Sequence, residues 1–202
     1  NLTRDFEPDV KESSIKAMAR AAFSENSHTL VGFLHSPTYY PFAFEALVKI
    51  GDEACDHLDQ LFLSPDSDNR LLSRIVKIFG KIGSQKAIES LLNKVEKQNK
   101  FIARQAIAAL REARFQATLS NINQILNSIV RATNIMSWNL SILYIIPYRK
   151  EYTLLRRAME SEMEDNYNLL YHLLSRAYNS NSVSNIRKLI EDGGDTDISY
   201  AL

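Results

Sequence analysis

The stretch SPDSDNRLLSRIVKIFGKIGSQKAIESLLNKVE, residues 64–96, decides the predicted fold. The small polar residues of 64–68 can cap the start of a helix. Gly80 and Gly83 are expected to loosen that helix, and Ser84 can cap a second one. Each helix carries apolar residues at helical spacing. They are Leu71, Leu72, Ile75, Val76, Phe79 and Ile82 in the first, and Ala87, Ile88, Leu91, Leu92 and Val95 in the second. One such pair has too small a core to be stable alone, so we expect it to stack on similar pairs.

Similar sequence breaks recur along the chain. Ser36-Pro37 and Ser64-Pro65 are 28 residues apart, and the Ile-Gly turns at 50 and 82 are 32 apart. A period near 30 residues predicts stacked helical pairs. At 113–115, Ala-Arg-Phe stands where Ile-Gly-polar is expected, so that turn must be built differently. Besides the two helices above, we predict helices over 9–23, 28–35, 39–50, 52–63, 99–114 and 116–132. The period fades beyond Asn134, where four helices are predicted: 137–146, 150–163, 166–178 and 183–191.

A family resemblance accompanies this period. The order polar-Pro-Asp, Arg, an apolar helix, Ile-Gly-Asp/Ser, Ala and a Leu-rich second helix resembles the short bacterial type of HEAT repeat. The resemblance covers residues 9–132. It implies an all-α fold, a right-handed α-α superhelix or HEAT-like solenoid, with residues 133–202 as a less regular helical cap. We therefore expect a single solenoid domain over 1–202, but HEAT repeats serve many unrelated tasks, so the resemblance predicts fold rather than function.

A second resemblance lies in the C-terminal part. The run LLRRAMESE at 154–162, followed by leucine-rich 169–174, is similar to the HEAT-repeat region that follows the membrane part in some bacterial proteins related to ATP/ADP translocases. It implies the cytosolic part of a transporter-like membrane protein. Because the sequence begins with Asn1 rather than Met, we expect a fragment of a longer chain. We expect it in the cytoplasm, tethered to the inner membrane through a part outside this sequence.

Basic residues are concentrated in the middle of the chain. The 202 residues carry 24 basic and 24 acidic side chains, yet 66–150 carry fourteen basic against five acidic ones. On the outer helices the basic residues fall on one face: Arg70, Arg74, Lys77 and Lys81, then Lys100, Arg104 and Arg111. Such a face is a candidate docking surface for an acidic protein, another domain of the same chain or an anionic membrane surface. A solvated helix face that binds nothing is the simpler interpretation of the same charges.

The inner helices argue against a nucleic-acid groove. Their charge changes sign along the array: it is acidic at 52–59, mostly basic at Lys86, Glu89, Lys94 and Lys97, and nearly absent at 120–128. A nucleic-acid groove needs basic residues along its length. A HEAT-like DNA-binding or DNA-repair protein of the alkylpurine glycosylase type remains the alternative function, and a protein-modifying HEAT enzyme is a third. Trp138 could stack on a base, but its apolar neighbours predict a buried packing role.

No reaction centre is predicted. Cys55 is the sole cysteine, and the charge of Asp56 would raise rather than lower its pKa, so we expect a small core residue. The carboxylates near His57 are explained by the helix dipole, and His28 and His35 have no evident third metal ligand. We therefore predict no catalytic, cofactor or metal site, and a non-catalytic protein-interaction or regulatory module. Aromatic clusters at 39–42 and 144–152 could anchor a partner or seal joints between repeats.

Overall fold

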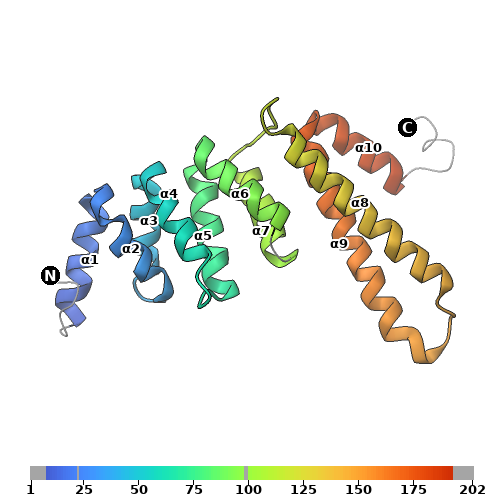
Figure 1. Cartoon of the computed structure of the whole chain (residues 1–202), viewed down its shortest axis with the longest axis horizontal. Coiled ribbons are helices and arrows are strands. Elements are labelled where there is room, and N and C mark those ends of the chain that lie inside the picture. Colours follow the sequence, from blue (N-terminus) through green and yellow to red (C-terminus); the bar gives the residue numbers. More distant parts are fainter. Residues whose placement is uncertain (1–7, 22, 98–99, 193–202) are drawn as a thin grey trace. The chain divides into compact units, whose positions relative to one another are not determined.

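The computed structural model describes residues 8–21, 23–97 and 100–192, and within these ranges all the regular secondary structure is helical. The predicted all-α class is therefore confirmed. The chain divides into two compact units, Asn1–Phe115 and Gln116–Leu202 (Figure 1). The first unit contains α1 (Pro8–Ala21), η2 (Ser24–Asn26), α2 (Ser27–Gly32), η3 (Phe33–His35), α3 (Tyr40–Ile50), α4 (Asp52–Phe62), α5 (Asn69–Ile82), α6 (Gln85–Lys97) and α7 (Lys100–Glu112). The second contains α8 (Ile122–Ile145), η4 (Lys150–Tyr152), α9 (Thr153–Ala177) and α10 (Ser180–Asp192).

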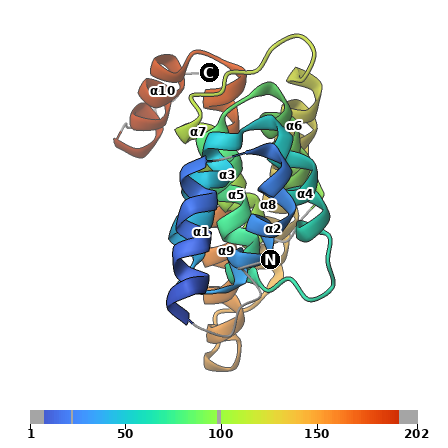
Figure 2. The same ribbon diagram turned by 90° about the vertical axis from the view of Figure 1, so that its left-hand side faces the viewer.

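The helices of the first unit pack in two rows. In one row α1 contacts α3, α3 contacts α5, and α5 contacts α7; in the other α2 contacts α4, and α4 contacts α6. Figure 2 shows the two rows nearly end-on, with α1 and α3 to one side and α2 and α4 to the other. Within the pairs, α3 contacts α4 and α5 contacts α6. Each pair therefore buries its apolar side chains partly against the next pair.

The stretch 64–96 forms α5 and α6 with the expected caps. Asp68 accepts a hydrogen bond from the amide of Leu71 at 2.8 Å, and Ser84 Oγ accepts one from the amide of Ala87 at 3.2 Å. Gly83 has φ of 63°, the left-handed conformation that ends a helix most readily when the residue is glycine. The predicted apolar residues of α5 from Leu71 to Phe79 are buried.

Gly80 has a different role from the one expected. α5 continues past it to Ile82, so Gly80 does not loosen the helix, and that prediction is wrong. Instead it allows a close approach to α7. A Cβ at Gly80 would lie 2.8 Å from Ala109 Cβ and 3.0 Å from Ala109 Cα. The missing side chain lets two stacked helices pack backbone against backbone.

The turn after α7 is built without glycine, as predicted. Arg114 takes a positive φ of 53°, and the amide of Phe115 donates to the carbonyl of Leu110 at 3.0 Å. Phe115 is buried. Its burial anchors the end of the first unit and compensates for the unfavourable conformation at Arg114.

The second unit contains two long helices where four shorter ones were predicted. α8 runs through the expected break at Asn134, and α9 runs through the expected break at 163–166. Neither of these expected breaks contains Gly or Pro. Pro147 is the first strong helix breaker after α8 begins. The predicted boundary at 132/133 therefore falls inside α8, and the expected helix 116–132 begins only at Ile122.

α8 and α9 lie side by side and are joined by residues 146–152, so they form a hairpin (Figure 1). On α8 the buried side chains are seven residues apart: Ile125, Ala132 and Asn139. This interval is typical of helices that pack along one seam, as in a coiled coil. α10 packs on α9, where Arg187 donates to Asn168 Oδ1 at 2.8 Å and lies 5.1 Å from the Tyr171 ring. α10 therefore covers the half of α9 that is remote from the connection.

Candidate functional site

The predicted docking residues do not all share one surface. Arg70, Lys77 and Lys81 on α5 are exposed, and so are Lys100, Arg104 and Arg111 on α7. Arg74 is only 8% exposed. The prediction that Arg74 lies on the outer face is therefore wrong, whereas the other six residues lie on the surface. We call these six residues the basic face.

Arg74 is a structural residue. Its Nη1 donates to the carbonyl of Leu34 in η3, at the end of the first pair, and its guanidinium lies 4.2 Å from the centre of the Tyr40 ring. Burial raises the pKa of Tyr40, and the nearby Arg74 charge partly offsets that effect. Arg74 therefore holds η3 and α3 against α5, using both its charge and its planar shape.

Part of the basic face borders a groove between α5 and α7, which we call the α5–α7 groove. It has a volume of about 390 Å³ and is lined by Lys77, Gln105, Ala108, Ala109, Arg111 and Glu112. Lys81 forms an ion pair of 2.6 Å with Glu112. The structure thus brings Lys77 and Arg111 to one groove, although they are 34 residues apart in sequence. Arg70, Lys100 and Arg104 do not line it.

The acidic side chains of α4 pair with α6. Asp52 accepts a hydrogen bond from Ser84, Asp56 binds Lys86 at 2.8 Å, and Asp59 accepts from Ser90 at 2.5 Å. Lys86 is partly exposed, and its pKa is raised by the hydrogen bond to Asp56. In each contact the two residues are about one repeat apart in sequence, so the contacts link the second helices of successive pairs. The acidic inner surface predicted for residues 52–59 is therefore partly neutralised by the next pair.

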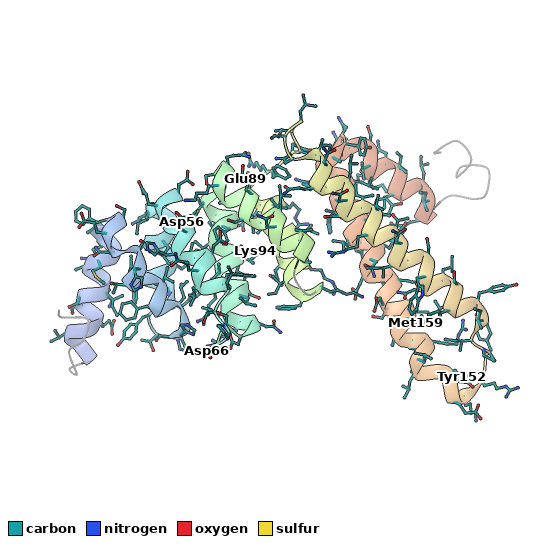
Figure 3. The ribbon with its side chains drawn as sticks, in the orientation of Figure 1. Asp56, Asp66, Glu89, Lys94, Tyr152 and Met159 are labelled. Carbon is teal, nitrogen blue, oxygen red and sulfur yellow. The ribbon has the colours of Figure 1, made fainter. Side chains whose placement is uncertain are left out.

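Lys94 of α6 adds a buried contact to α4. It donates to Asp59 at 2.5 Å and lies 4.4 and 4.6 Å from the ring centres of Phe62 and Phe79. Figure 3 shows Lys94 on α6 and Asp56 on the neighbouring α4. Burial lowers the pKa of Lys94, while the hydrogen bond to Asp59 acts in the opposite direction. The ammonium group is enclosed by aromatic rings, which stabilise it and keep it from solvent.

Cys55 is a core residue, as predicted. It is completely buried, and burial raises its pKa to about 11, with Asp52 adding to the effect. A thiol with a raised pKa and no access to solvent is a poor nucleophile. The arrangement around Cys55 therefore supports packing and no covalent chemistry.

A serine–histidine contact joins α2 and α4. Ser27 Oγ lies 2.8 Å from His57 Nδ1, and the rings of His57 and His28 are 5.8 Å apart. Ser27 is 1% exposed, so a substrate cannot reach its hydroxyl. Among the described residues, no three His, Cys, Asp or Glu side chains are grouped closely enough to hold a metal ion. The contact between Ser27 and His57 links two helices rather than forming a nucleophilic pair.

Trp138 is 64% exposed, so the predicted buried packing role is wrong. It borders a cavity of about 560 Å³ between α8 and α9, whose lining includes Val130, Ile135, Asn139 and Glu162. The Asn139 side chain is buried, and its amide nitrogen has no hydrogen-bond partner. The Ile135, Met136 and Leu140 neighbours that suggested burial are spread around α8, and only one flank of this helix meets α9.

Several large apolar side chains are exposed near the connection between α8 and α9. Tyr144 is 93% exposed and Tyr148 is 88% exposed, and Ile145 and Leu154 are at least three-quarters exposed. The aromatic cluster at 144–152 was the sequence signal for this region. What the sequence did not reveal is that this cluster lies at the end of a long hairpin.

None of the helices in the described ranges combines the length and the apolar character required to cross a bilayer. Comparisons with protein-family models, curated proteins and solved structures returned no match for this chain.

Proposed function

We propose that this chain is a non-catalytic protein-interaction module built on a HEAT-like superhelix. Two features of the first unit support the proposal. Helices contact each other in two parallel rows, and three polar contacts join residues of α4 to residues 30 to 32 positions later, in or just before α6. Both are expected when helical pairs are repeated and stacked. In such an array the exposed surfaces of successive helices form a continuous binding face.

The binding site that we propose is the α5–α7 groove, and its ligand is an acidic segment of a partner protein or of another domain of the same chain. The observation that carries this proposal is that Lys77 and Arg111, from successive first helices, line one groove. Gln105 adds an amide to the same lining. Arg and Lys side chains can donate charge-assisted hydrogen bonds to carboxylates, and Arg can do so with two parallel bonds.

The shape of the groove favours a peptide segment over a phosphate backbone. Ala108 and Ala109 also line the groove, and their small side chains let an extended chain approach α7 closely. Glu112 also lines the groove, and its carboxylate would repel a dense row of phosphates even though Lys81 pairs with it. Nucleic-acid binding requires neutralisation of several phosphates along a strand. A segment with two or three spaced carboxylates fits this charge pattern better.

The experiment measures binding of a fluorescein-labelled Asp/Glu-rich peptide to the full chain at about 50 mM and 200 mM salt. We expect the peptide to bind and the charge-reversed variant K77E/R111E to bind at least about tenfold more weakly, because two charge-assisted hydrogen bonds are lost. The matched control is R20E/K49E, which reverses two exposed charges on α1 and α3. Equal affinity of the two variants would refute the site.

A competition experiment distinguishes peptide binding from the alternative function, DNA binding. Unlabelled duplex DNA is added to the peptide complex at equal total charge. We expect the peptide to remain bound, because the groove offers few cations to a phosphate backbone. If DNA displaces the labelled peptide at a lower total concentration of negative charge than unlabelled peptide requires, the HEAT-like DNA-binding alternative is favoured instead.

A further inference from the structure

The α8–α9 hairpin has an apolar end, residues 144–157, which we call the hairpin end. Tyr144, Ile145, Tyr148 and Leu154 expose most of their surface there. Figure 3 shows Tyr152 at this same end of the hairpin. Single exposed apolar residues are normal on a protein surface, but a cluster of large ones marks an interaction site. We therefore expect the hairpin end to bind a ligand that is partly apolar.

The charges at the hairpin end point to an anionic occupant. Arg149, Lys150 and Arg157 are exposed, and Glu151 is the only acidic residue between Tyr144 and Arg157. With Arg156, the segment carries a net charge of +3. The whole of α8, which leads into it, has no acidic residue. Apolar and aromatic side chains surrounded by basic ones match a surface that is apolar inside and negatively charged outside.

The hairpin end is held in a defined shape. The buried Arg156 donates through Nη1 to the carbonyls of Leu143 and Ile146, at 2.8 and 2.9 Å. Its guanidinium lies 3.8 Å from the centre of the Tyr148 ring. These contacts satisfy carbonyl groups at the C-terminal end of α8 and fix the connection to α9. The exposed aromatic side chains are therefore presented by a folded turn.

We propose that the hairpin end binds an anionic membrane surface, with its apolar side chains entering the boundary between headgroups and acyl chains. Tyr side chains suit this boundary because the ring is apolar and the hydroxyl is polar. Ile145 and Leu154 supply apolar groups for the acyl side, and the three exposed basic residues meet the anionic headgroups. The surface is the projecting end of two helices, whereas a peptide helix is bound in a groove. This proposal concerns the second unit and is independent of the α5–α7 groove.

The position of Trp138 on α8 allows the depth of insertion to be measured. It precedes the last residue of α8, Ile145, by seven residues, which corresponds to about 10 Å along a helix. Peripheral apolar groups enter a bilayer to a depth of about 5–10 Å. Trp138 should therefore lie near the headgroup level when the hairpin end is inserted. As the sole tryptophan of the chain, it is a natural fluorescent probe.

The first experiment is sedimentation of the full chain with vesicles of phosphatidylcholine alone or with about 30% phosphatidylserine. We expect binding to the anionic vesicles only, and a decrease with rising salt. The variants I145S/Y148S and R149E/K150E should each weaken the partition coefficient at least about tenfold, since each removes apolar or electrostatic contact with the bilayer. Leu119→Ser, at an exposed apolar residue before α8, and K49E/K188E, at exposed basic residues elsewhere, are the matched controls.

The second experiment tests the orientation. In the chain with Trp138 and in the variant W138F/Y148W, tryptophan emission is recorded with vesicles whose acyl chains carry bromine. We expect strong quenching and a blue shift for Tyr148→Trp and weaker quenching for Trp138. Stronger quenching of Trp138 than of the tryptophan at 148 would show that the side of the hairpin binds, and would overturn the proposal.

Two further outcomes would also overturn it. The first is the absence of sedimentation with anionic vesicles at low salt, or equal sedimentation of the hairpin-end variants and their controls. The second is a concentration-dependent dimer, measured by analytical ultracentrifugation, that I145S/Y148S dissociates while vesicles do not bind. That result would identify a second copy of the chain as the occupant. The substituted side chains are exposed, but Tyr148 also contacts Arg156, so thermal unfolding and circular dichroism of the variants are compared with those of the natural chain to verify that they are folded.

Discussion

Gly80 of α5 lies so close to Ala109 of α7 that a Cβ on Gly80 would be 2.8 Å from the Ala109 Cβ. The contact joins the first helices of two successive pairs and places Lys77 and Arg111 along the same groove. Helices can approach this closely only where small residues face each other. The absence of one side chain therefore determines the geometry of the proposed peptide site.

Gly80→Ala is expected to destabilise the chain by about 1–3 kcal/mol, because the new methyl group meets backbone and Cβ atoms that cannot move away freely. The measurement is urea unfolding followed by circular dichroism. The matched control is Gly32→Ala, where a Cβ would have no atom within 4 Å. It should be neutral or stabilise by up to about 1 kcal/mol. Equal effects of the two variants would contradict the close approach of α5 and α7.

Arg74→Ala is expected to lower the free energy of unfolding by about 1.5–3 kcal/mol, since it removes a charge-assisted hydrogen bond to Leu34 and the contact with the Tyr40 ring. Arg70→Ala, one turn earlier on the exposed surface, should change it by less than about 0.5 kcal/mol. Arg74→Lys should recover only part of the loss, because an ammonium group cannot reproduce the planar stacking. Thermal and urea unfolding of the three variants measure this order.

Asp59 and Lys94 should respond asymmetrically to substitution. Asp59→Ala leaves a buried ammonium group without its carboxylate, and we expect a loss of about 3 kcal/mol. Lys94→Met removes the buried charge and keeps a side chain of similar length between Phe62 and Phe79. Asp59 is partly exposed and keeps its hydrogen bond from Ser90, so this variant should be near neutral or stabilising. Urea unfolding measures the free energy of unfolding of both variants. A large decrease in Lys94→Met would show that the ammonium–ring contacts stabilise the fold by more than the cost of burying the charge.

Cys55 should make the chain less stable at alkaline pH. Its pKa rises from 9.0 to about 11 on folding, so between these values the unfolded chain loses the thiol proton while the folded chain keeps it. The unfolded state then binds fewer protons, and the free energy of unfolding falls as pH rises from 9 to 11. Cys55→Ala should show a shallower fall over this window than the natural chain. Lys94 acts in the opposite direction below its ordinary pKa of 10.5, because burial lowers its folded-state pKa. Both chains in this comparison keep Lys94, so its contribution is the same in each.

Sequence patterns alone predicted much of the first unit. The apolar spacing located α5 and α6, and Asp68, Gly83 and Ser84 end or begin helices there as expected. These features are local: a cap or a left-handed glycine depends on neighbours within one turn of helix. The proposed docking residues were predicted only in part, because six of the seven lie on the surface and Arg74 does not.

The second unit shows why the remainder could not be predicted. The period of the first unit suggested a break near Asn134, yet no Gly or Pro enforces one, and α8 continues to Ile145. Trp138 has apolar neighbours in sequence, but helical geometry spreads them around α8. Which of them is buried depends on the path of α9, and this path is determined by packing between different helices.

The sequence by itself determined that this chain forms helices, where most of them begin in the first unit, and which side of each is apolar, because these properties arise from residues within a few positions of one another. Only the tertiary structure decided that Arg74 is enclosed while Arg70 is exposed, that Lys77 and Arg111 share a groove, and that Tyr144 and Tyr148 project from the hairpin end. Exposure is a property of the neighbours that cover a side chain. Those neighbours come from other helices, and helical spacing describes a side chain's direction on its own helix without specifying what lies opposite it.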